Sequence, residues 1–195
     1  MNLSESMTLR NLMRAFAGES QARNRYTFAA GLARSQKLPV LERLFEYTAG
    51  QEKEHAEIFF NHMKTAGVDN VAIDAAYPVD SCGDILPLLK AAHHNELEEF
   101  ESAYPAFAKT AREEGFSLIA ESFERIAAIE KIHGERFARF ARLLESGELF
   151  SAAGAVNWMC LNCGHVHSGK DAPAVCPFCA HERGYFVRME DSPFH

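Results

Sequence analysis

Two short motifs in the first three quarters of the chain carry residue types that bind metals. Glu52-x-x-His55 and Glu130-x-x-His133 each place a carboxylate and an imidazole three residues apart. In a helix, residues at i and i+3 lie on one face, so each motif can offer two ligands to one site. One such motif in a helical chain is mostly chance, but a second copy with matched surroundings argues against chance.

A lone glutamate precedes each of these motifs at nearly the same distance. Glu19 lies 33 residues before Glu52, and Glu96 lies 34 residues before Glu130, which indicates an internal repeat that delivers two half-sites. One Glu from each of two helices and a Glu-x-x-His from each of the other two is the pattern of di-iron and di-manganese carboxylate proteins. Glu99, one turn after Glu96, has no counterpart in the first half of the chain.

A second cluster of metal-binding residues lies near the C-terminus. Cys160-x-x-Cys163 and Cys176-x-x-Cys179 are separated by twelve residues. Four thiolates in two such pairs predict a tetrahedral site for iron or zinc. Zinc there would only stabilise the fold, and the spacing does not choose between the two metals. The remaining cysteine, Cys82, is expected to be a small buried residue or an unremarkable thiol.

Helical periodicity predicts the elements that position the glutamates and histidines. Four helices are expected over residues 8–35, 40–65, 84–113 and 117–144, in a region poor in Gly and Pro. Pro105 should kink the third helix or break its hydrogen-bond ladder. The turns after the first and third helices are short, so each pair should form an antiparallel hairpin.

The connection between the two hairpins, residues 66–83, is long enough to cross the length of a bundle. The fold class predicted is therefore mainly α, a ferritin-like four-helix bundle with one long crossover over residues 1–147. Residues 146–157 indicate a flexible linker. The remainder indicates a small β- and turn-rich unit that needs a metal for stability, so the second predicted domain is 148–195, the linker with the four-cysteine unit.

The five glutamates named above fall where the helical stripes call for apolar side chains. Removing even one lone carboxylate from water costs several kcal/mol in practice, and five together would also repel one another. Arg23 lies on the first stripe, but one cation cannot balance five anions. Two divalent ions supply four positive charges and two trivalent ions supply six, so a pair of iron ions that cycles between these states is electrostatically reasonable. Tyr26, two turns after Glu19, could donate its hydroxyl hydrogen to a ligating carboxylate.

Composition excludes several classes of protein. The 195 residues are 47% apolar and 24% charged, and 20 Lys and Arg against 27 Asp and Glu give a net charge of −7, which argues against a nucleic-acid partner. The sequence contains no apolar run of about 18 residues, the length that a membrane-spanning helix needs. The first twenty residues lack the pattern of a signal peptide, so a cytoplasmic location is expected.

Taken together, the motifs resemble the rubrerythrin family over essentially the whole chain. The segments that carry the resemblance are Ala17-Gly18-Glu19-Ser20-Gln21-Ala22, Glu52-Lys53-Glu54-His55-Ala56, Glu96-x-x-Glu99 before Tyr104-Pro105, Glu130-x-x-His133, Trp158-Met159-Cys160 and Cys176-Pro177-Phe178-Cys179-Ala180-His181. The resemblance implies a ferritin-like di-iron domain followed by a rubredoxin-like domain whose four cysteines hold one iron.

The resemblance also implies roles for individual residues. The implied di-iron ligands are Glu19, Glu52, His55, Glu96, Glu99, Glu130 and His133. Glu52 and Glu130 would bridge the two ions, and Glu99 and His55 would exchange as ligands when one iron moves on reduction. Tyr26 and Tyr104 match tyrosines beside the ligands. Glu99, His55 and Tyr26 are the predicted catalytic residues.

The activity that the resemblance implies is the reduction of hydrogen peroxide to water, a protection against oxidative stress. Electrons would come from a redox donor protein, either rubredoxin or a pyridine-nucleotide-dependent reductase. A twelve-residue linker spans at most roughly 40 Å and a 28-residue helix is roughly 42 Å long, so a head-to-tail homodimer is expected to bring the four-cysteine site to a neighbour's bundle. Two alternatives stay open: a ferritin-like ferroxidase that handles iron, and a bundle with a purely structural zinc ribbon.

Overall fold

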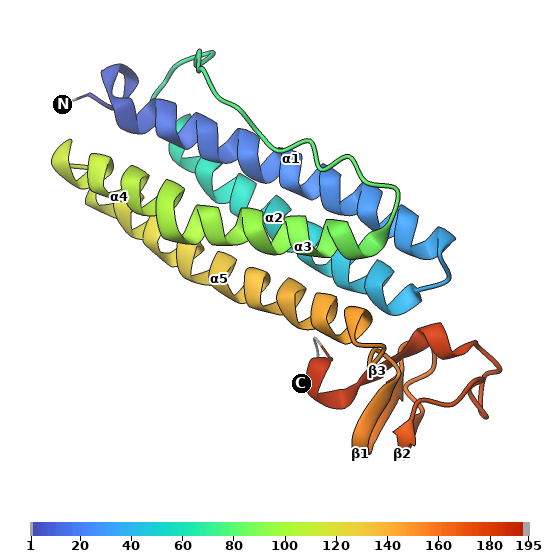
Figure 1. Cartoon of the computed structure of the whole chain (residues 1–195). Coiled ribbons are helices and arrows are strands. Elements are labelled where there is room, and N and C mark those ends of the chain that lie inside the picture. The colour runs from blue at the N-terminus through green and yellow to red at the C-terminus, as the bar shows by residue number, and fades with distance from the viewer. Residues whose placement is uncertain (1, 193–195) are drawn as a thin grey trace.

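The fold is an antiparallel helical bundle with a small sheet at one end (Figure 1). The structure is a computed structural model that describes residues 2–192. Its long helical segments, in chain order, are α1 (Met7–Ser35), α2 (Pro39–Lys64), α3 (Ile85–Glu98), the π-helical turn η2 (Glu99–Ala103), α4 (Tyr104–Glu113) and α5 (Ser117–Glu145). α1 packs on α2, while α3 and α4 pack on α5. This arrangement confirms the predicted pair of hairpins.

Local signals in the sequence explain where the helices begin and end. The Ser6 side chain accepts a hydrogen bond from the backbone N–H of Leu9 and caps α1. Pro39 occupies the first turn of α2, where its missing N–H does no harm. Gly115 adopts a φ of 89° between α4 and α5, a conformation that suits glycine. The expected helix ends are therefore confirmed to within a few residues.

The third rod of the bundle is interrupted where the sequence predicts a disturbance. Pro105 has no backbone N–H to donate, and the five residues before α4 form the π-helical turn η2. Within it the N–H of Tyr104 bonds to the carbonyl of Glu99. One wider turn rotates the following residues about the helix axis, which changes the side of the rod on which Tyr104 emerges.

Residues 66–84, hereafter the crossover, connect α2 to α3 along the outside of α1 (Figure 1). The Tyr77 hydroxyl donates to the backbone carbonyl of Arg14 at 2.8 Å. Asp80 accepts a hydrogen bond from Asn95 at 3.0 Å and forms an ion pair with Arg25. Cys82 is exposed in this segment, so it is a surface thiol and not a buried residue.

The C-terminal unit is a three-stranded antiparallel sheet in the order β2-β1-β3, with β1 (Ser151–Cys160) in the centre. The flanking elements are β2 (Val166–Asp171), β3 (Phe186–Arg188) and two short 3-10 turns, η3 (Arg183–Tyr185) and η4 (Met189–Asp191); another, η1 (Leu3–Glu5), precedes α1. Trp158 pairs with His167 on one side and Arg188 on the other, and its side chain is completely buried.

The prediction of a flexible linker over residues 146–157 is wrong for most of that segment. β1 already begins at Ser151, and the side chains of Leu149 and Ala152 are buried. The small residues after Ser151 sit in an irregularity of the β1–β2 register, where the strand bends. The predicted domain limits, 1–147 and 148–195, stay predictions, and residues 1 and 193–195 lie outside the described residues.

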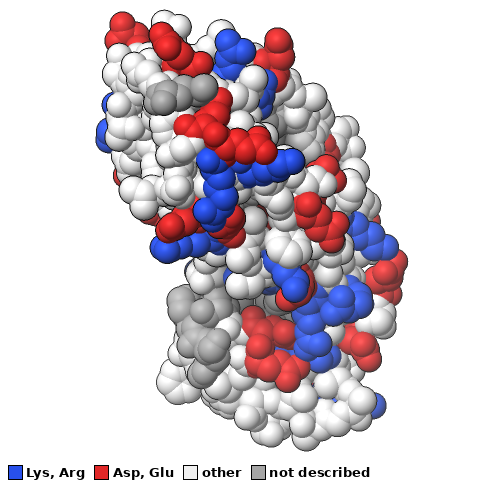
Figure 2. Space-filling model, turned by 90° about the vertical axis from the view of Figure 1, so that its left-hand side faces the viewer, with Lys and Arg blue, Asp and Glu red and all other residues white. Residues whose placement is uncertain are grey.

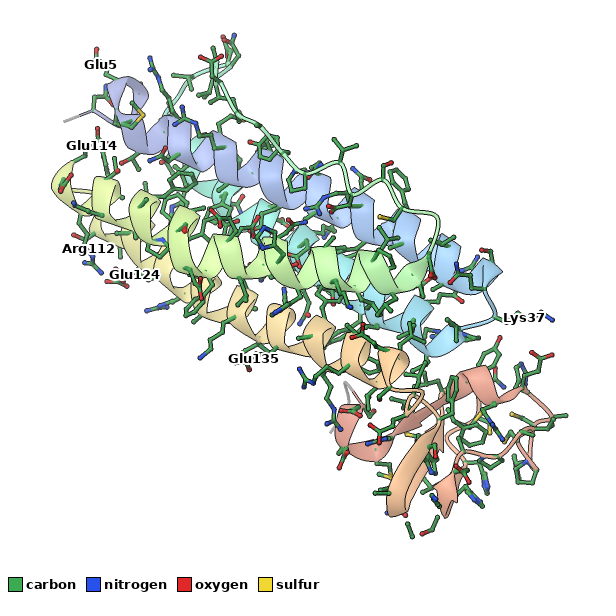
Figure 3. All side chains as sticks on the ribbon, in the orientation of Figure 1. Glu5, Lys37, Arg112, Glu114, Glu124 and Glu135 are labelled. Atoms are coloured by element: carbon green, nitrogen blue, oxygen red, sulfur yellow. The ribbon has the colours of Figure 1, made fainter. Side chains whose placement is uncertain are left out.

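The small unit docks on the end of the bundle that carries the α1–α2 turn. Val187 and Leu149 belong to the same apolar cluster as the inner residues of the helices. Arg139 of α5 forms an ion pair with Asp191 at 3.0 Å. Lys37, labelled in Figure 3, marks the α1–α2 turn beside the small unit. Gly184 lies against this turn so closely that an added Cβ would be 2.6 Å from the Lys37 carbonyl oxygen.

Replacing Gly184 by Val is therefore expected to loosen the docked unit. The new side chain would clash with backbone, which cannot move aside as a flexible side chain can, and overpacking of this kind costs about 1–3 kcal/mol. The measurement is limited proteolysis between α5 and β1, with the melting temperature of each variant. Gly154→Val is the control, since an added Cβ there meets nothing within 4 Å; equal cleavage of the two variants would contradict the prediction.

Charged side chains on the outside of the molecule are mixed in sign. On the face in Figure 2, basic and acidic residues are interspersed. At the end of the bundle away from the sheet, Arg112 and Glu124 lie side by side (Figure 3) and form an ion pair of 2.6 Å. Within residues 2–192, no helix combines the length and the apolar character that a membrane span requires.

Candidate metal centres

A layer of buried ionisable side chains divides the apolar core of the bundle into two clusters. One cluster, around Phe45 and Phe137, lies toward the sheet, and the other, around Phe59 and Phe123, lies toward the opposite end. The buried ionisable residues between them are Glu19 from α1, Glu52 and His55 from α2, Glu96 from α3, and Glu130 and His133 from α5. Each of the four rods of the bundle thus contributes to this layer, the third rod through α3.

The six residues form two overlapping groups of four. Glu19 and His55 belong to the first group, Glu96 and His133 belong to the second, and in each group one ligand atom per residue lies within 4.8 Å of the others. Glu52 and Glu130 belong to both groups. Two carboxylates shared by two groups of ligands are what a pair of bridged metal ions requires.

The contacts inside the layer fit metal ligation better than hydrogen bonding. His133 Nδ1 lies 2.9 Å from a Glu52 oxygen and 2.8 Å from a Glu130 oxygen, and His55 Nδ1 lies 2.8 Å from the other Glu130 oxygen. Even so, both Glu130 oxygens and both His133 nitrogens lack a hydrogen-bond partner within residues 2–192. An octahedral site with bonds of about 2.1 Å places neighbouring ligand atoms about 3.0 Å apart, so these donors fit a pair of ions.

The electrostatics of the metal-free layer show what the ions would neutralise. Burial raises the pKa of Glu19 and Glu96 well above the usual range, and the neighbouring carboxylates raise it further. Burial disfavours a charged His55, but the adjacent carboxylates of Glu130, Glu19 and Glu52 outweigh burial and raise its pKa. Without metal the layer must therefore take up protons, which two cations would replace.

Arg23, which the helical stripe places near the carboxylates, does not neutralise them. Arg23 is exposed, so the expectation that it faces the carboxylates is wrong. The first helix turns Arg25 toward the crossover instead, where it is half-buried and pairs with Asp80. The reason is angular: the buried face of α1 at this height is formed by Ala22 and Tyr26, and Arg23, one residue after Ala22, lies about 100° away from Ala22 around the helix.

Two buried tyrosines orient carboxylates of the layer. The Tyr26 hydroxyl donates to a Glu96 oxygen, and the Tyr104 hydroxyl donates to a Glu19 oxygen. The hydrogen bond expected from Tyr26 to a ligating carboxylate is thus present, and its acceptor, Glu96, lies on α3. Sequence spacing could not assign Tyr104 to Glu19, because the π-helical turn before it changes its direction.

Replacing Tyr26 by Phe should weaken the second group of ligands. The variant keeps the ring, which packs on Phe137 with centroids 5.1 Å apart, and loses only the hydrogen bond to Glu96. Partners of this kind are worth roughly 10–100-fold in metal affinity or activity. Iron content and chelator competition measure the effect, and Tyr47→Phe, on the outer part of α2, is the control. Equal affinities in both variants would contradict the prediction.

Glu99, the seventh predicted ligand, lies apart from both groups of four. It is half-buried at the start of η2, on the side of the layer that faces α1, where one of its oxygens would lie 3.8 Å from a Cβ added to Gly18. Burial and the charges of Glu130 and Glu52 raise its pKa well above the usual range. Glu99 is therefore close enough for the charges of the layer to shift its pKa, but it does not belong to either group of four.

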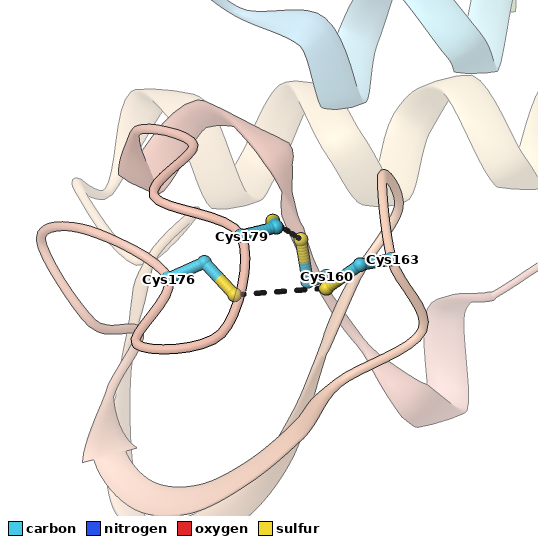
Figure 4. A group of neighbouring side chains, drawn as sticks. All are labelled: Cys160, Cys163, Cys176 and Cys179. Carbon is cyan, nitrogen blue, oxygen red and sulfur yellow. Dashed lines mark hydrogen bonds between the residues drawn. The ribbon is translucent and has the colours of Figure 1, made fainter.

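The four C-terminal cysteines form the second candidate centre (Figure 4). The Sγ atoms of Cys160 and Cys179 lie 3.7 Å apart, as do those of Cys163 and Cys176. A tetrahedral site with metal–sulfur bonds of about 2.3 Å has edges of about 3.8 Å. No disulfide joins these residues, which are all free thiols.

Backbone N–H groups point at two of the sulfur atoms. The N–H groups of Asn162 and Cys163 bond to Cys160 Sγ. A hydrogen bond from the His181 N–H is the main reason that the pKa of the Cys179 thiol is lowered to about 6. Thiolates are the form that binds metal, so the His181 N–H favours ligation by Cys179.

The geometry of the bundle layer defines a class of protein: a ferritin-like di-metal carboxylate protein that carries an additional four-thiolate metal unit. The Rubrerythrin family profile matches residues 10–141, and the profile of the rubredoxin-like domain of rubrerythrin matches residues 158–187. The chain belongs to the rubrerythrin family, and the cofactors expected from its motifs, a di-iron centre and a rubredoxin-type iron, are those of the family's two domains.

Individual relatives agree over nearly the full length. The rubrerythrins of Porphyromonas gingivalis and Nitratidesulfovibrio vulgaris are each 41% identical to this chain, over 97% and 95% of it and 93% and 95% of their own lengths. A fully reduced, all-ferrous nigerythrin structure superposes with a TM-score of 0.64 at 30% identity, covering 93% of this chain and 86% of the other. A bacterioferritin from Mycobacterium tuberculosis, 17% identical with a TM-score of 0.63 over 71% of this chain and 86% of its own, shares the fold.

Proposed function

We propose that this iron-binding oxidoreductase is a peroxidase that reduces hydrogen peroxide to water in the cytoplasm and protects against oxidative stress. The observation that carries the proposal is the pair of ligand groups with two shared carboxylates, Glu52 and Glu130, in a chain that also holds a four-thiolate site. Reduction of one peroxide consumes two electrons and two protons and yields two waters, so two adjacent one-electron donors match the demand.

When bound, the two irons would supply these two electrons and the thiolate iron would replace them one at a time. The residues of the chain do the remaining work. Tyr26 and Tyr104 hold Glu96 and Glu19 in place by hydrogen bonds. We assign Glu99 and His55 as the exchanging pair, since Glu99 lies just outside the groups and His55 lies inside the first. The apolar clusters on either side keep bulk water from the layer.

Within one chain, electrons would have to travel a long way from the four-cysteine site to the carboxylate layer. Glu130 lies fifteen residues before the end of α5, which is roughly 22 Å along the helix axis, and the four-cysteine unit lies beyond that end (Figure 1). A second copy packed head to tail would place its thiolate site beside the middle of this bundle. The proposed assembly is therefore a head-to-tail homodimer, and the proposed donor is a rubredoxin or a pyridine-nucleotide-dependent reductase.

The deciding experiment combines metal analysis with a visible spectrum before and after peroxide is added to the anaerobically reduced protein. The expected result is three irons per chain, a red ferric tetrathiolate that is bleached by reduction, and its return on stoichiometric addition of peroxide. A colourless, zinc-loaded thiolate site would indicate a structural ribbon. Iron uptake into large particles in light scattering, without peroxide turnover, would indicate a ferroxidase. Either outcome overturns the proposal.

A further inference from the structure

A cavity of about 310 Å³ lies between α1, the crossover and the third rod of the bundle. Its walls include Gly18 and Arg25 from α1, Tyr77 from the crossover, Glu99 from η2 and Tyr104 from α4. Two of these residues have a direct relation to the carboxylate layer, since Tyr104 donates to Glu19 and Glu99 is the predicted exchanging ligand. The cavity therefore reaches the layer from outside.

Exposure identifies the side on which the layer opens. Six of the seven predicted ligands are buried, and Glu99 alone among the seven is half-buried. A small molecule from solvent thus meets Glu99 first, through this cavity. Along the bundle, an apolar cluster lies on either side of the layer, and the six other ligands are at most 5% exposed.

Gly18 keeps the cavity open next to Glu99. A Cβ at this position would lie 3.5 Å from the Tyr77 ring and 3.8 Å from a Glu99 oxygen. Glycine in the interior of a helix is less stable than alanine by about 1 kcal/mol, so its presence in α1 has a structural cost. The space that it leaves lies between the ring and the carboxylate.

The outer wall of the cavity is held in place by hydrogen bonds from α1 and α3. The Tyr77 hydroxyl donates to the Arg14 carbonyl at 2.8 Å, and the neighbouring Pro78 carbonyl accepts from the Gln21 amide. Two residues further on, Asp80 is bound by Arg25 and Asn95. The ring of Tyr77 is thus a fixed wall of the cavity, which limits the size of what can pass it.

We infer that this cavity is the substrate entrance of the di-iron site and that Tyr77, opposite Gly18, is a specificity-determining residue. This inference rests on the proposed peroxidase function for its substrate. Small hydroperoxides such as hydrogen peroxide pass between the Tyr77 ring and Gly18, and hydroperoxides that carry an aromatic or branched group do not. The chemistry at the metal does not distinguish these substrates, because both contain the same O–O bond.

The first test measures entry without turnover, as the association rate of azide with the iron-loaded, oxidised protein by stopped-flow absorbance. Gly18→Leu should slow association roughly tenfold or more, as when binding requires the protein to rearrange. Gly31→Leu is the matched control, since it lies in the same helix and an added Cβ there meets nothing within 4 Å. Gly18→Ala carries the test if the Leu variant does not load iron. Azide association in the Gly18 variants equal to the control would overturn the inference.

The second test measures the preference for hydrogen peroxide over cumene hydroperoxide as a ratio of kcat/KM values. Tyr77→Ala should reduce this preference roughly tenfold or more. Tyr77→Phe keeps the ring and loses only the bond to Arg14, so it should change the preference much less, because Pro78 and Asp80 still hold the crossover. A preference unchanged in Tyr77→Ala would overturn the assignment of Tyr77. If the wild-type chain reduces neither peroxide, the proposed function fails, and the azide rates still decide whether the cavity is the entrance.

Discussion

A chain carrying Glu130→Gln should lose both irons of the bundle and not only one. Glu130 belongs to both groups of ligands, and an amide offers one neutral oxygen in place of two anionic ones. Because a partner that merely orients a ligand is worth roughly 10–100-fold in metal affinity, removing a carboxylate shared by both groups should lower the affinity by more than about 100-fold. Iron analysis after gel filtration, with chelator competition, measures the loss. Glu52→Gln should behave in the same way, for the same reason.

Stability gives an independent reading of the same substitution. Metal that binds only the folded chain raises the melting temperature. Iron in the bundle should therefore stabilise the wild type, while Glu130→Gln should gain only what iron in the intact four-cysteine site contributes. Glu135→Gln is the matched control: it lies on the same helix, is exposed at the surface (Figure 3) and pairs only loosely with Lys131 at 3.8 Å. Two tightly bound irons in Glu130→Gln would show that the carboxylate layer is not the di-iron site.

Replacing Cys179 by Ser should abolish steady-state peroxide reduction and preserve a single turnover. A serine hydroxyl does not ionise near neutral pH, so the thiolate site loses a ligand and its iron, and turnover with an external donor should fall by about 100-fold or more. The bundle centre, reduced chemically beforehand, should still consume one peroxide at the wild-type rate. Stopped-flow absorbance and a donor-oxidation assay separate these two phases.

The surface thiol provides the control for this experiment. Cys82→Ser changes an exposed residue of the crossover and should leave iron content, colour and turnover as in the wild type. If Cys179→Ser retained full steady-state turnover, electrons would reach the bundle without the thiolate site, and the role proposed for that site would be wrong.

Much of the fold follows from local patterns in the chain. The helical periodicity, Pro39, Gly115 and Pro105 locate the helices and the disturbance in the third rod, because each of these effects acts within a few residues. The same holds for candidate ligands: a Glu-x-x-His on a helix places both side chains on one face whatever surrounds it. The cysteine pairs likewise carry their turn geometry with them.

Contacts between distant segments had no such local signal. The segment after α5 has the composition of a linker, yet it becomes the central strand because β2 and β3 pair with both of its edges. Arg23 and Arg25 are two positions apart in the chain. Only the packing of α1 decides that Arg25 pairs with Asp80 while Arg23 stays exposed. Residue type alone says nothing about such choices.

The sequence by itself therefore determined the helices, the order of the two metal-binding units and the residue types at each centre. Only the tertiary structure decided that Tyr104 bonds to Glu19, that Glu99 lies at the edge of the layer, and that Tyr77 lines a cavity together with Gly18. The physical reason is range. Helical periodicity and cysteine spacing depend on residues that are close in the chain. The contacts of Tyr104 with Glu19 and of Tyr77 with Gly18 join residues that are 59 or more positions apart. The direction of Tyr104 also depends on the π-helical turn before it.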